Sequence, residues 1–346
     1  MTQLIMTGLY DAYLPLVQSL NGYGGNFTSI HIRRPVLDAI DNGAGNDPSL
    51  VSVRDKLHEK MEQWTGLQDH ETFSEFFEAY YEGVFYLVAL HRGLALRSVP
   101  AGRDKGNTPD FATASSPSVN FEVKTIDVAD PGRTYDRTME EGLDAKVDAT
   151  ARAKQSGLGI AARTISPHGT ARNRREAVEQ VMKKIDSNVK AGQYRAAPTF
   201  LVVSMARTSI HDRAENLRKR LPWPYQHQDA SGQLFTIAAH ELDAPFFYFP
   251  EWENHIENLG PLQRAGILRD HEFIAGLIFL ATKWSARNDE QPVAGVYSLN
   301  GIWNSAWEKN NGFGPQATAG AKRIFESLCH AWNDTEDSRS PLLPTQ

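Results

Sequence analysis

The chain has 346 residues, of which 41% are hydrophobic and 23% charged, and its formal net charge at pH 7 is -6. This balance is typical of a globular protein with ample material for a core, and it argues against a generic basic protein that coats nucleic acid. The single cysteine, Cys329, excludes an internal disulfide and a cysteine-built zinc site. Because we find no secretory leader and no bilayer-length apolar stretch, we expect a cytoplasmic protein that does not enter a membrane.

Residues 1–66 are predicted to form an N-terminal helical extension. Short apolar runs alternate there with turns rich in glycine and asparagine, and a helix is expected from Val53 to Trp64. A longer helix is predicted from Glu71 to His91, with Asp69 as its N-cap and Gly93 as its C-cap. Its apolar side chains recur at three- and four-residue steps and therefore indicate a face that packs on the core.

Three short strands are expected after this helix, at Ala95–Val99, Asp110–Thr113 and Val119–Val128, with turn-rich segments between them. A polar insertion at about residues 130–172 follows, with one helix expected near residues 143–155. A second core helix is predicted from Arg174 to Ala191, ending at Gly192, and a buried strand from Pro198 to Met205. The order of helix, three strands, helix and strand predicts an α/β fold with a mixed central sheet flanked by helices.

The pattern is less regular after Ala206. We expect a basic helix at Ile210–Leu221 and a disordered tail beyond Thr335. Apolar segments with strand character lie at residues 235–239, 246–249, 274–282 and 295–299. Residues 67–206 thus form the expected core, and residues 207–346 are either a C-terminal extension of this core or a recognition lobe.

The strongest local feature joins Pro109-Asp110 to Glu122-Val123-Lys124. Side chains alternate along a strand, so Glu122 and Lys124 share one face, while Val123 and Phe121 point to the other face. A hairpin through residues 114–118 would bring Asp110 beside Glu122.

Two carboxylates held close together repel each other unless a cation lies between them. Mg²⁺ suits such a pair, since it prefers oxygen ligands and commonly takes one or two carboxylates together with waters and a phosphate oxygen. The ammonium group of Lys124 would lie next to that ion, where it could orient or deprotonate a water and neutralise developing phosphate charge. These residues supply the groups needed to hydrolyse a phosphodiester.

This pattern resembles the PD-(D/E)XK signature of the restriction-endonuclease-like nucleases, whose core order is αβββαβ. The resemblance covers roughly residues 70–205. It implies a DNA-cleaving enzyme that depends on Mg²⁺, for which Mn²⁺ can substitute, with Asp110 and Glu122 as metal ligands and Lys124 acting on the attacking water. Members of the family often carry a further glutamate on the first helix, a position to which Glu82 corresponds, with Glu78 in reserve. They also often place a Gln or Lys on the second core helix, where Lys183, Lys184 and Gln193 are the candidates.

A basic segment accompanies the expected second core helix. Residues 146–190 contain ten Lys or Arg against four Asp or Glu. Arg172, Arg174, Arg175, Lys183 and Lys184 are the candidate contacts to a DNA backbone. A solvated helix face would show the same composition, so both interpretations stay open.

The sequence therefore predicts a metal-dependent DNA endonuclease of restriction, repair or antiphage defence. The alternatives are a non-catalytic module that binds nucleic acid or protein on a degenerate nuclease fold, and a nuclease directed at RNA. A homodimer is compatible with the prediction, because one active site cuts one strand, and so is a partner subunit that supplies specificity.

Overall fold

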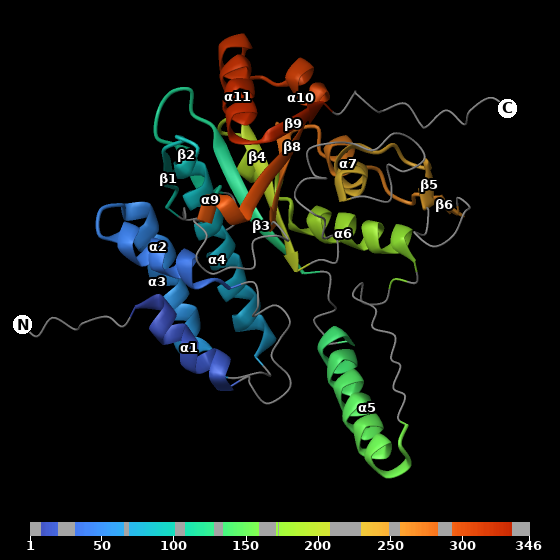
Figure 1. Ribbon diagram of the computed structural model, residues 1–346. Helices are drawn as coiled ribbons and strands as arrows, with labels where there is room; N and C mark the ends of the chain where they lie inside the picture. The colour runs from blue at the N-terminus through green and yellow to red at the C-terminus, as the bar shows by residue number, and fades with distance from the viewer. Residues whose placement is uncertain are drawn as a thin grey trace, which may run out of the picture.

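The computed structural model describes residues 8–19, 32–65, 69–100, 108–127, 134–158, 171, 173–207, 230–248, 257–282 and 293–333. The fold is α/β, with a mixed seven-stranded sheet between helices (Figure 1). The strand order is β1-β2-β3-β4-β7-β8-β9. The bounds are β1 Leu96–Ser98, β2 Phe111–Thr113, β3 Asn120–Asp127, β4 Thr199–Arg207, β7 Gly276–Thr282, β8 Tyr297–Trp303 and β9 His330–Asn333.

Strand pairing makes the sheet mixed. The pairs β1/β2, β2/β3 and β7/β8 are antiparallel, whereas β3/β4, β4/β7 and β8/β9 are parallel. The central strand β4 is buried on both faces. Phe200 and Val202 join one hydrophobic cluster, and Leu201 and Val203 join the other. The predicted mixed sheet flanked by helices is therefore confirmed.

Helices from the N-terminal region cover one face of the sheet. These are α1 (Leu9–Ser19), α2 (Arg34–Ala44), α3 (Pro48–Gln63) and α4 (His70–His91), and their apolar side chains share one cluster with Phe121 and Val123 of β3. Helix α3 begins five residues before the predicted Val53. The reason is its cap: the side chain of Asp47 accepts a hydrogen bond from the Ser49 N–H, and Pro48 occupies the first helical position.

Helix α4 begins one residue before the predicted Glu71 and ends at the predicted His91. The side chain of Asp69 accepts a hydrogen bond from the Thr72 N–H at 3.1 Å. At the other end Gly93 has a φ of +80°, and the N–H groups of Gly93 and Leu94 donate to the carbonyls of Leu90 and Ala89. This pattern of two bonds around a left-handed glycine is a Schellman motif, which satisfies carbonyls at the helix end.

The opposite face of the sheet is covered by α6 (Arg174–Asn188) and α7 (Ala230–Ala239). Helix α6 ends before the predicted Gly192, because the chain turns at Val189 into the extended region and then forms the 3₁₀ helix η2 (Ala191–Tyr194). Gly192 thus lies inside η2. The expected insertion contains α5 (Thr134–Ser156), which stands apart from the sheet in Figure 1.

The C-terminal third contributes strands β7, β8 and β9 to the same sheet. It also contains the separate hairpin of β5 (Pro245–Tyr248) and β6 (Glu257–Pro261), and the helices α8 (Ile267–Asp270), α9 (Val293–Val296), α10 (Ser305–Asn310) and α11 (Pro315–Leu328). The predicted strand at residues 235–239 is wrong, since these residues belong to α7. A short, continuously apolar run has no periodicity that distinguishes a buried helix from a buried strand. The strand predicted at residues 295–299 begins only at Tyr297, after α9.

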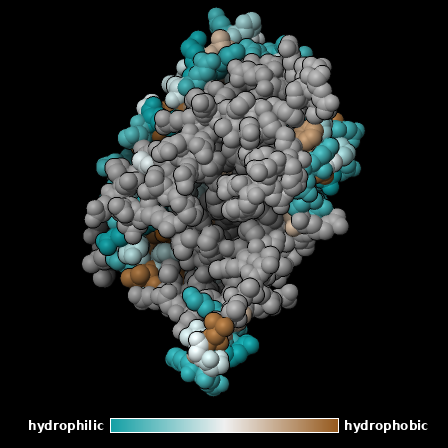
Figure 2. Space-filling model, turned by 45° about the vertical axis from the view of Figure 1, so that its right-hand side comes forward, coloured by the Kyte–Doolittle hydropathy of each residue, from teal (hydrophilic) through white to brown (hydrophobic). Residues whose placement is uncertain are grey.

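Two predictions lie outside the described residues, namely the basic helix at Ile210–Leu221 and the disordered tail beyond Thr335. No helix among the described residues has the length and apolar character needed to cross a bilayer. The coloured part of the surface in Figure 2 is mostly hydrophilic, with small separate hydrophobic areas. Four large hydrophobic side chains are exposed in the described parts, those of Leu90, Val147, Leu158 and Leu242.

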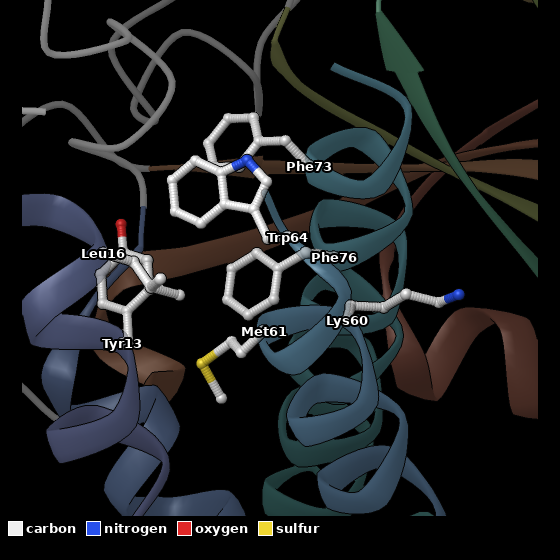
Figure 3. Close-up of a pocket in the computed structure, with 7 residues that line it drawn as sticks. All are labelled: Tyr13, Leu16, Lys60, Met61, Trp64, Phe73 and Phe76. Carbon is white, nitrogen blue, oxygen red and sulfur yellow. The ribbon is translucent and has the colours of Figure 1, made fainter. Parts of the chain in front are cut away.

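Aromatic side chains fix the N-terminal helices on α4. A pocket between α1, the end of α3 and the start of α4 is lined by Tyr13, Leu16, Lys60, Met61, Trp64, Phe73 and Phe76 (Figure 3). The rings of Trp64 and Phe73 stack with centroids 5.2 Å apart, and those of Tyr13 and Phe76 stack at 5.7 Å. These contacts hold α3 against the helix that carries Glu82.

We predict that Gly93→Ala lowers the free energy of unfolding by about 1 kcal/mol, because an L-residue is strained in the left-handed region. Space is not the cause, since an added Cβ would meet nothing within 4 Å. Gly312→Ala is the matched control, with equally open surroundings and no positive φ. Urea unfolding of both variants checks the prediction, and equal effects at the two positions would contradict it.

Candidate active site

Asp110 is held where strand β2 begins. The register pairs Phe111 with Phe121, so Pro109 would face Val123 two positions further on. Proline has no N–H and cannot continue the ladder, so β2 stops there. The side chain of Asp110 serves as the hydrogen-bond partner of β3 at this point, because its Oδ2 accepts a hydrogen bond from the Val123 N–H at 2.7 Å. The predicted hairpin is confirmed, although Asp110 lies one residue before the strand.

Glu122 and Lys124 project from the face of β3 opposite Phe121 and Val123. Glu122 is paired with Leu201 in the parallel register, and Leu201 belongs to the cluster under α6 and α7. The Lys124 Nζ lies 2.5 Å from the Glu122 Oε1, and the side chain of Glu122 is only 1% exposed. The side chain of Lys124 is 28% exposed, so this buried ion pair remains open to solvent on its lysine side.

Gln193 of η2 completes the surroundings of Glu122. Its Nε2 donates a hydrogen bond to the Glu122 Oε1 at 2.6 Å. The Glu122 Oε2 is buried and has no hydrogen-bond partner among the described residues, and the same is true of the Gln193 Oε1 and the Tyr194 hydroxyl. A buried carboxylate oxygen without a partner is costly, and such an atom calls for an explanation such as an ion or a water.

Glu82 of α4 reaches the site from the other helical layer. Its Oε2 accepts a hydrogen bond from the Lys56 Nζ of α3 at 2.7 Å, and its side chain is 14% exposed. Glu78, one turn earlier on α4, is exposed. The pKa of Glu78 is raised, mainly because neighbouring groups remove part of its hydration. The charge of Lys124 opposes this shift and that of Asp110 adds to it, so Glu78 also lies within electrostatic range of the site.

Asp110 acts electrostatically on both Glu82 and Glu122. Burial, and after it the charge of Asp110, raises the pKa of Glu82 to about 7 and that of Glu122 to about 7. Burial also raises the pKa of Asp110, against the opposing effects of Lys124 and of the Val123 N–H. Asp110 is therefore the acid that connects Glu82 on α4 with Glu122 on β3.

Lys124 is held in its charged form. Burial by itself would lower the pKa of Lys124, but the charges of Glu122 and Asp110 and the hydrogen bond to Glu122 outweigh it, so the pKa is raised. Lys124 is therefore an ammonium group at neutral pH and donates hydrogen bonds.

The carboxylates fit a divalent cation of the Mg²⁺ type. The Glu122 Oε2 is an unpartnered buried acceptor, and only Oδ2 of Asp110 has a hydrogen-bond partner in the described parts of the chain. No group of three Asp, Glu, His or Cys side chains within the described ranges converges tightly enough to hold a metal. The donor set is therefore a pair of carboxylates with a third nearby, and Mg²⁺ commonly takes one or two carboxylates and fills its other positions with water.

The basic candidates on α6 and just before it differ in their surroundings. Arg172 lies outside the described residues. Arg175 is engaged within the protein, because its Nη1 donates a hydrogen bond to the Pro261 carbonyl at 2.7 Å. Lys183 and Lys184 are exposed, and Lys184 acts electrostatically on Glu78. Arg174 begins the helix and is half-buried.

Reasoning from the sequence missed Lys56 and Tyr194 and did not single out Gln193 among its candidates for the second core helix. Lys56 lies on a different helix, 26 positions before Glu82, and no local spacing connects the two. Gln193 and Tyr194 follow α6 in η2. The predicted helix extended to Ala191, so the turn that begins there was not recognised. The signal that could have found Gln193 and Tyr194 is that these two polar side chains lie in the short connection between α6 and the buried strand β4.

Comparisons of the chain with protein-family models, with curated proteins and with solved structures found no match.

We predict that Glu122→Gln weakens the fall in stability that the metal-free protein shows as pH rises from 4.5 towards about 7. In this interval the folded protein holds a proton on Glu122 that the unfolded chain has already lost. Folding therefore favours the protonated form, and the free energy of unfolding decreases with rising pH. A glutamine cannot titrate, so its contribution to this slope disappears.

Thermal unfolding in a chelator across this pH range, for the wild-type protein and the variant, measures the difference. Glu59→Gln on α3 is the control, since the Glu59 side chain is 57% exposed. A difference between wild type and Glu122→Gln that stays constant with pH would contradict the prediction.

Proposed function

We propose that this protein is a metal-dependent nuclease that hydrolyses phosphodiester bonds of DNA. The observation that carries the proposal is the arrangement of Asp110, Glu122 and Lys124, in which a buried carboxylate bonded to a lysine retains an unpartnered oxygen and lies within electrostatic range of a second carboxylate. Separately, the order α4-β1-β2-β3-α6-β4, with α5 inserted between β3 and α6, supports a restriction-endonuclease-like core within the larger mixed sheet.

Asp110 and Glu122 are the residues that would hold the cation. Glu82, the further glutamate expected on the first core helix, lies within electrostatic range of Asp110 but does not converge with the other two as a third ligand. Mg²⁺, or Mn²⁺ in its place, supplies Lewis acidity that polarises a phosphoryl oxygen and makes water a stronger acid. The cation also relieves the repulsion among carboxylates that burial brings together. The Gln193 Nε2 donates a hydrogen bond to the Glu122 Oε1, which leaves the Glu122 Oε2 free to act as a ligand atom.

Lys124 acts first as a cation in this proposal. Its ammonium group donates to the phosphate oxygens, where negative charge accumulates, and orients the attacking water. A positive ion held by Glu122 and Asp110 would cancel the two charges that raise the pKa of Lys124. Lys124 would then release a proton more readily, so one residue could serve both for charge stabilisation and for water activation.

The DNA strand would approach along the exposed side of α6. Lys184 is exposed and lies within electrostatic range of Glu78, and Lys183 precedes it. Point charges on flexible stems suit contacts to a phosphate backbone, which position the strand without reading its sequence. Arg175 is not part of this path, because its guanidinium is engaged by Pro261.

We predict that Asp110→Ala and Lys124→Ala each abolish cleavage of plasmid DNA in the presence of Mg²⁺ or Mn²⁺. Uncatalysed phosphodiester hydrolysis is extremely slow, and enzymes accelerate such reactions by about 10⁶-fold or more, so loss of a metal ligand or of the lysine leaves no measurable product. Lys309→Ala on α10 is the control for Lys124→Ala, since Lys309 is exposed and belongs to a different part of the fold.

The assay compares supercoiled, linear and single-stranded DNA with RNA, with each ion and with a chelator. Folding of each variant is checked by circular dichroism. Cleavage of wild-type extent by either purified variant would refute the site. Binding of nucleic acid by the wild-type protein, with no cleavage under any of these conditions, would instead identify a non-catalytic module on this fold.

A further inference from the structure

Lys56 places a second ammonium group at the site, and this group comes from the N-terminal helices. Its Nζ donates one hydrogen bond to the Glu82 Oε2 at 2.7 Å. An ammonium group has three donors, and the side chain of Lys56 is 48% exposed, so its remaining donors face solvent. Charge interactions also connect Lys56 with Asp110 and with Lys124. Lys56 and Lys124 therefore both lie within electrostatic range of Asp110.

The charge balance at the site explains why such a lysine would be useful. The described groups that act on one another there are the carboxylates of Glu78, Glu82, Asp110 and Glu122 and the ammonium groups of Lys56, Lys124 and Lys184. Glu75 also acts on Glu78, but its charge is balanced by its ion pair with Lys60. When all are ionised, one negative charge is in excess, which weakens the attraction of the lysines for a phosphate without abolishing it. A divalent cation held by the carboxylates would reverse this sign. The lysines would then attract a phosphate more strongly than in the metal-free protein.

We propose that Lys56 is a substrate-binding residue that donates hydrogen bonds to a backbone phosphate of the nucleic-acid strand. The inference rests on the proposed function and adds to it that helix α3 supplies part of the substrate site. In the metal-free protein Glu82 holds the Lys56 ammonium by an ion pair and so competes with a phosphate for it.

The chain supplies a matched control on the same helix. Lys60 lies one turn after Lys56 and pairs with Glu75 of α4 at 2.9 Å, so both lysines bridge α3 to α4 by the same kind of contact. In Figure 3 the Lys60 ammonium points away from the aromatic side chains of the pocket. The charged partners of Lys60 are Glu75 and Glu59, and the site carboxylates are not among them.

The experiment measures binding of a labelled DNA duplex by fluorescence anisotropy in a chelator, over a range of salt concentrations. The proteins are the wild type, Lys56→Met, Lys56→Arg and Lys60→Met. Each phosphate contact contributes about 0.9 to the slope of log affinity against log salt. We expect Lys56→Met to lower the slope by about this amount, Lys56→Arg to retain it, and Lys60→Met to leave it unchanged.

A second arm separates phosphate binding from a purely structural bridge. Glu82→Gln removes the partner that competes with phosphate for Lys56, so it should tighten metal-free binding in the wild-type background more than in the Lys56→Met background. Such non-additivity is the signature of a direct coupling between two residues. Equal effects of Glu82→Gln in both backgrounds, or an unchanged slope for Lys56→Met, would overturn the inference.

These outcomes can be distinguished from failure of the proposed function, because binding in a chelator does not require cleavage. If the salt slope of DNA binding depends on Lys56 but the protein never cleaves DNA, the nuclease proposal is refuted and the phosphate contact of Lys56 is retained. If cleavage depends on Asp110 but DNA binding is unaffected by Lys56→Met, the phosphate contact is refuted and the nuclease proposal is retained.

Discussion

The burial of Glu122 beside Lys124 is the interaction on which the rest of the site depends. A carboxylate with 1% of its side chain exposed normally requires partners for both oxygens, yet the structure provides Lys124 and Gln193 for Oε1 and leaves Oε2 without a partner in the described residues. Neutral apolar residues would stabilise this strand more easily, as they do on its opposite face at Phe121 and Val123. The arrangement costs stability, and a ligand bound by the free oxygen would offset that cost.

Asp110 and the α4 layer gain their role from backbone geometry. Pro109 ends the β2 ladder, and the Asp110 carboxylate then accepts the Val123 N–H. From this position Asp110 raises the pKa of Glu82 on one side and of Glu122 on the other. The aromatic packing of α3 on α4 holds Lys56 against Glu82. The N-terminal helices thus support the site and contribute a charge to it.

Much of the core could be predicted because its signals are local. The apolar period of α4, the Asp69 cap, the Gly93 end and the alternation of Glu122 and Lys124 along β3 each involve residues close in sequence. The strand predicted at residues 235–239 failed because a short buried apolar run carries no period that separates helix from strand. Lys56 was not identified, and Gln193 was not singled out from Lys183 and Lys184, since each meets its carboxylate through packing of elements distant in the chain.

Binding of Mn²⁺ to the metal-free protein, followed by electron paramagnetic resonance, tests the central claim most directly, because it reports occupancy without any assumption about substrate. The account predicts that the wild-type chain binds Mn²⁺, that Mg²⁺ displaces it, and that Asp110→Asn and Glu122→Gln each lose this binding while remaining folded. Absence of Mn²⁺ binding by the wild-type protein, or binding of equal affinity by both variants, would contradict the claim that these two carboxylates form a cation site.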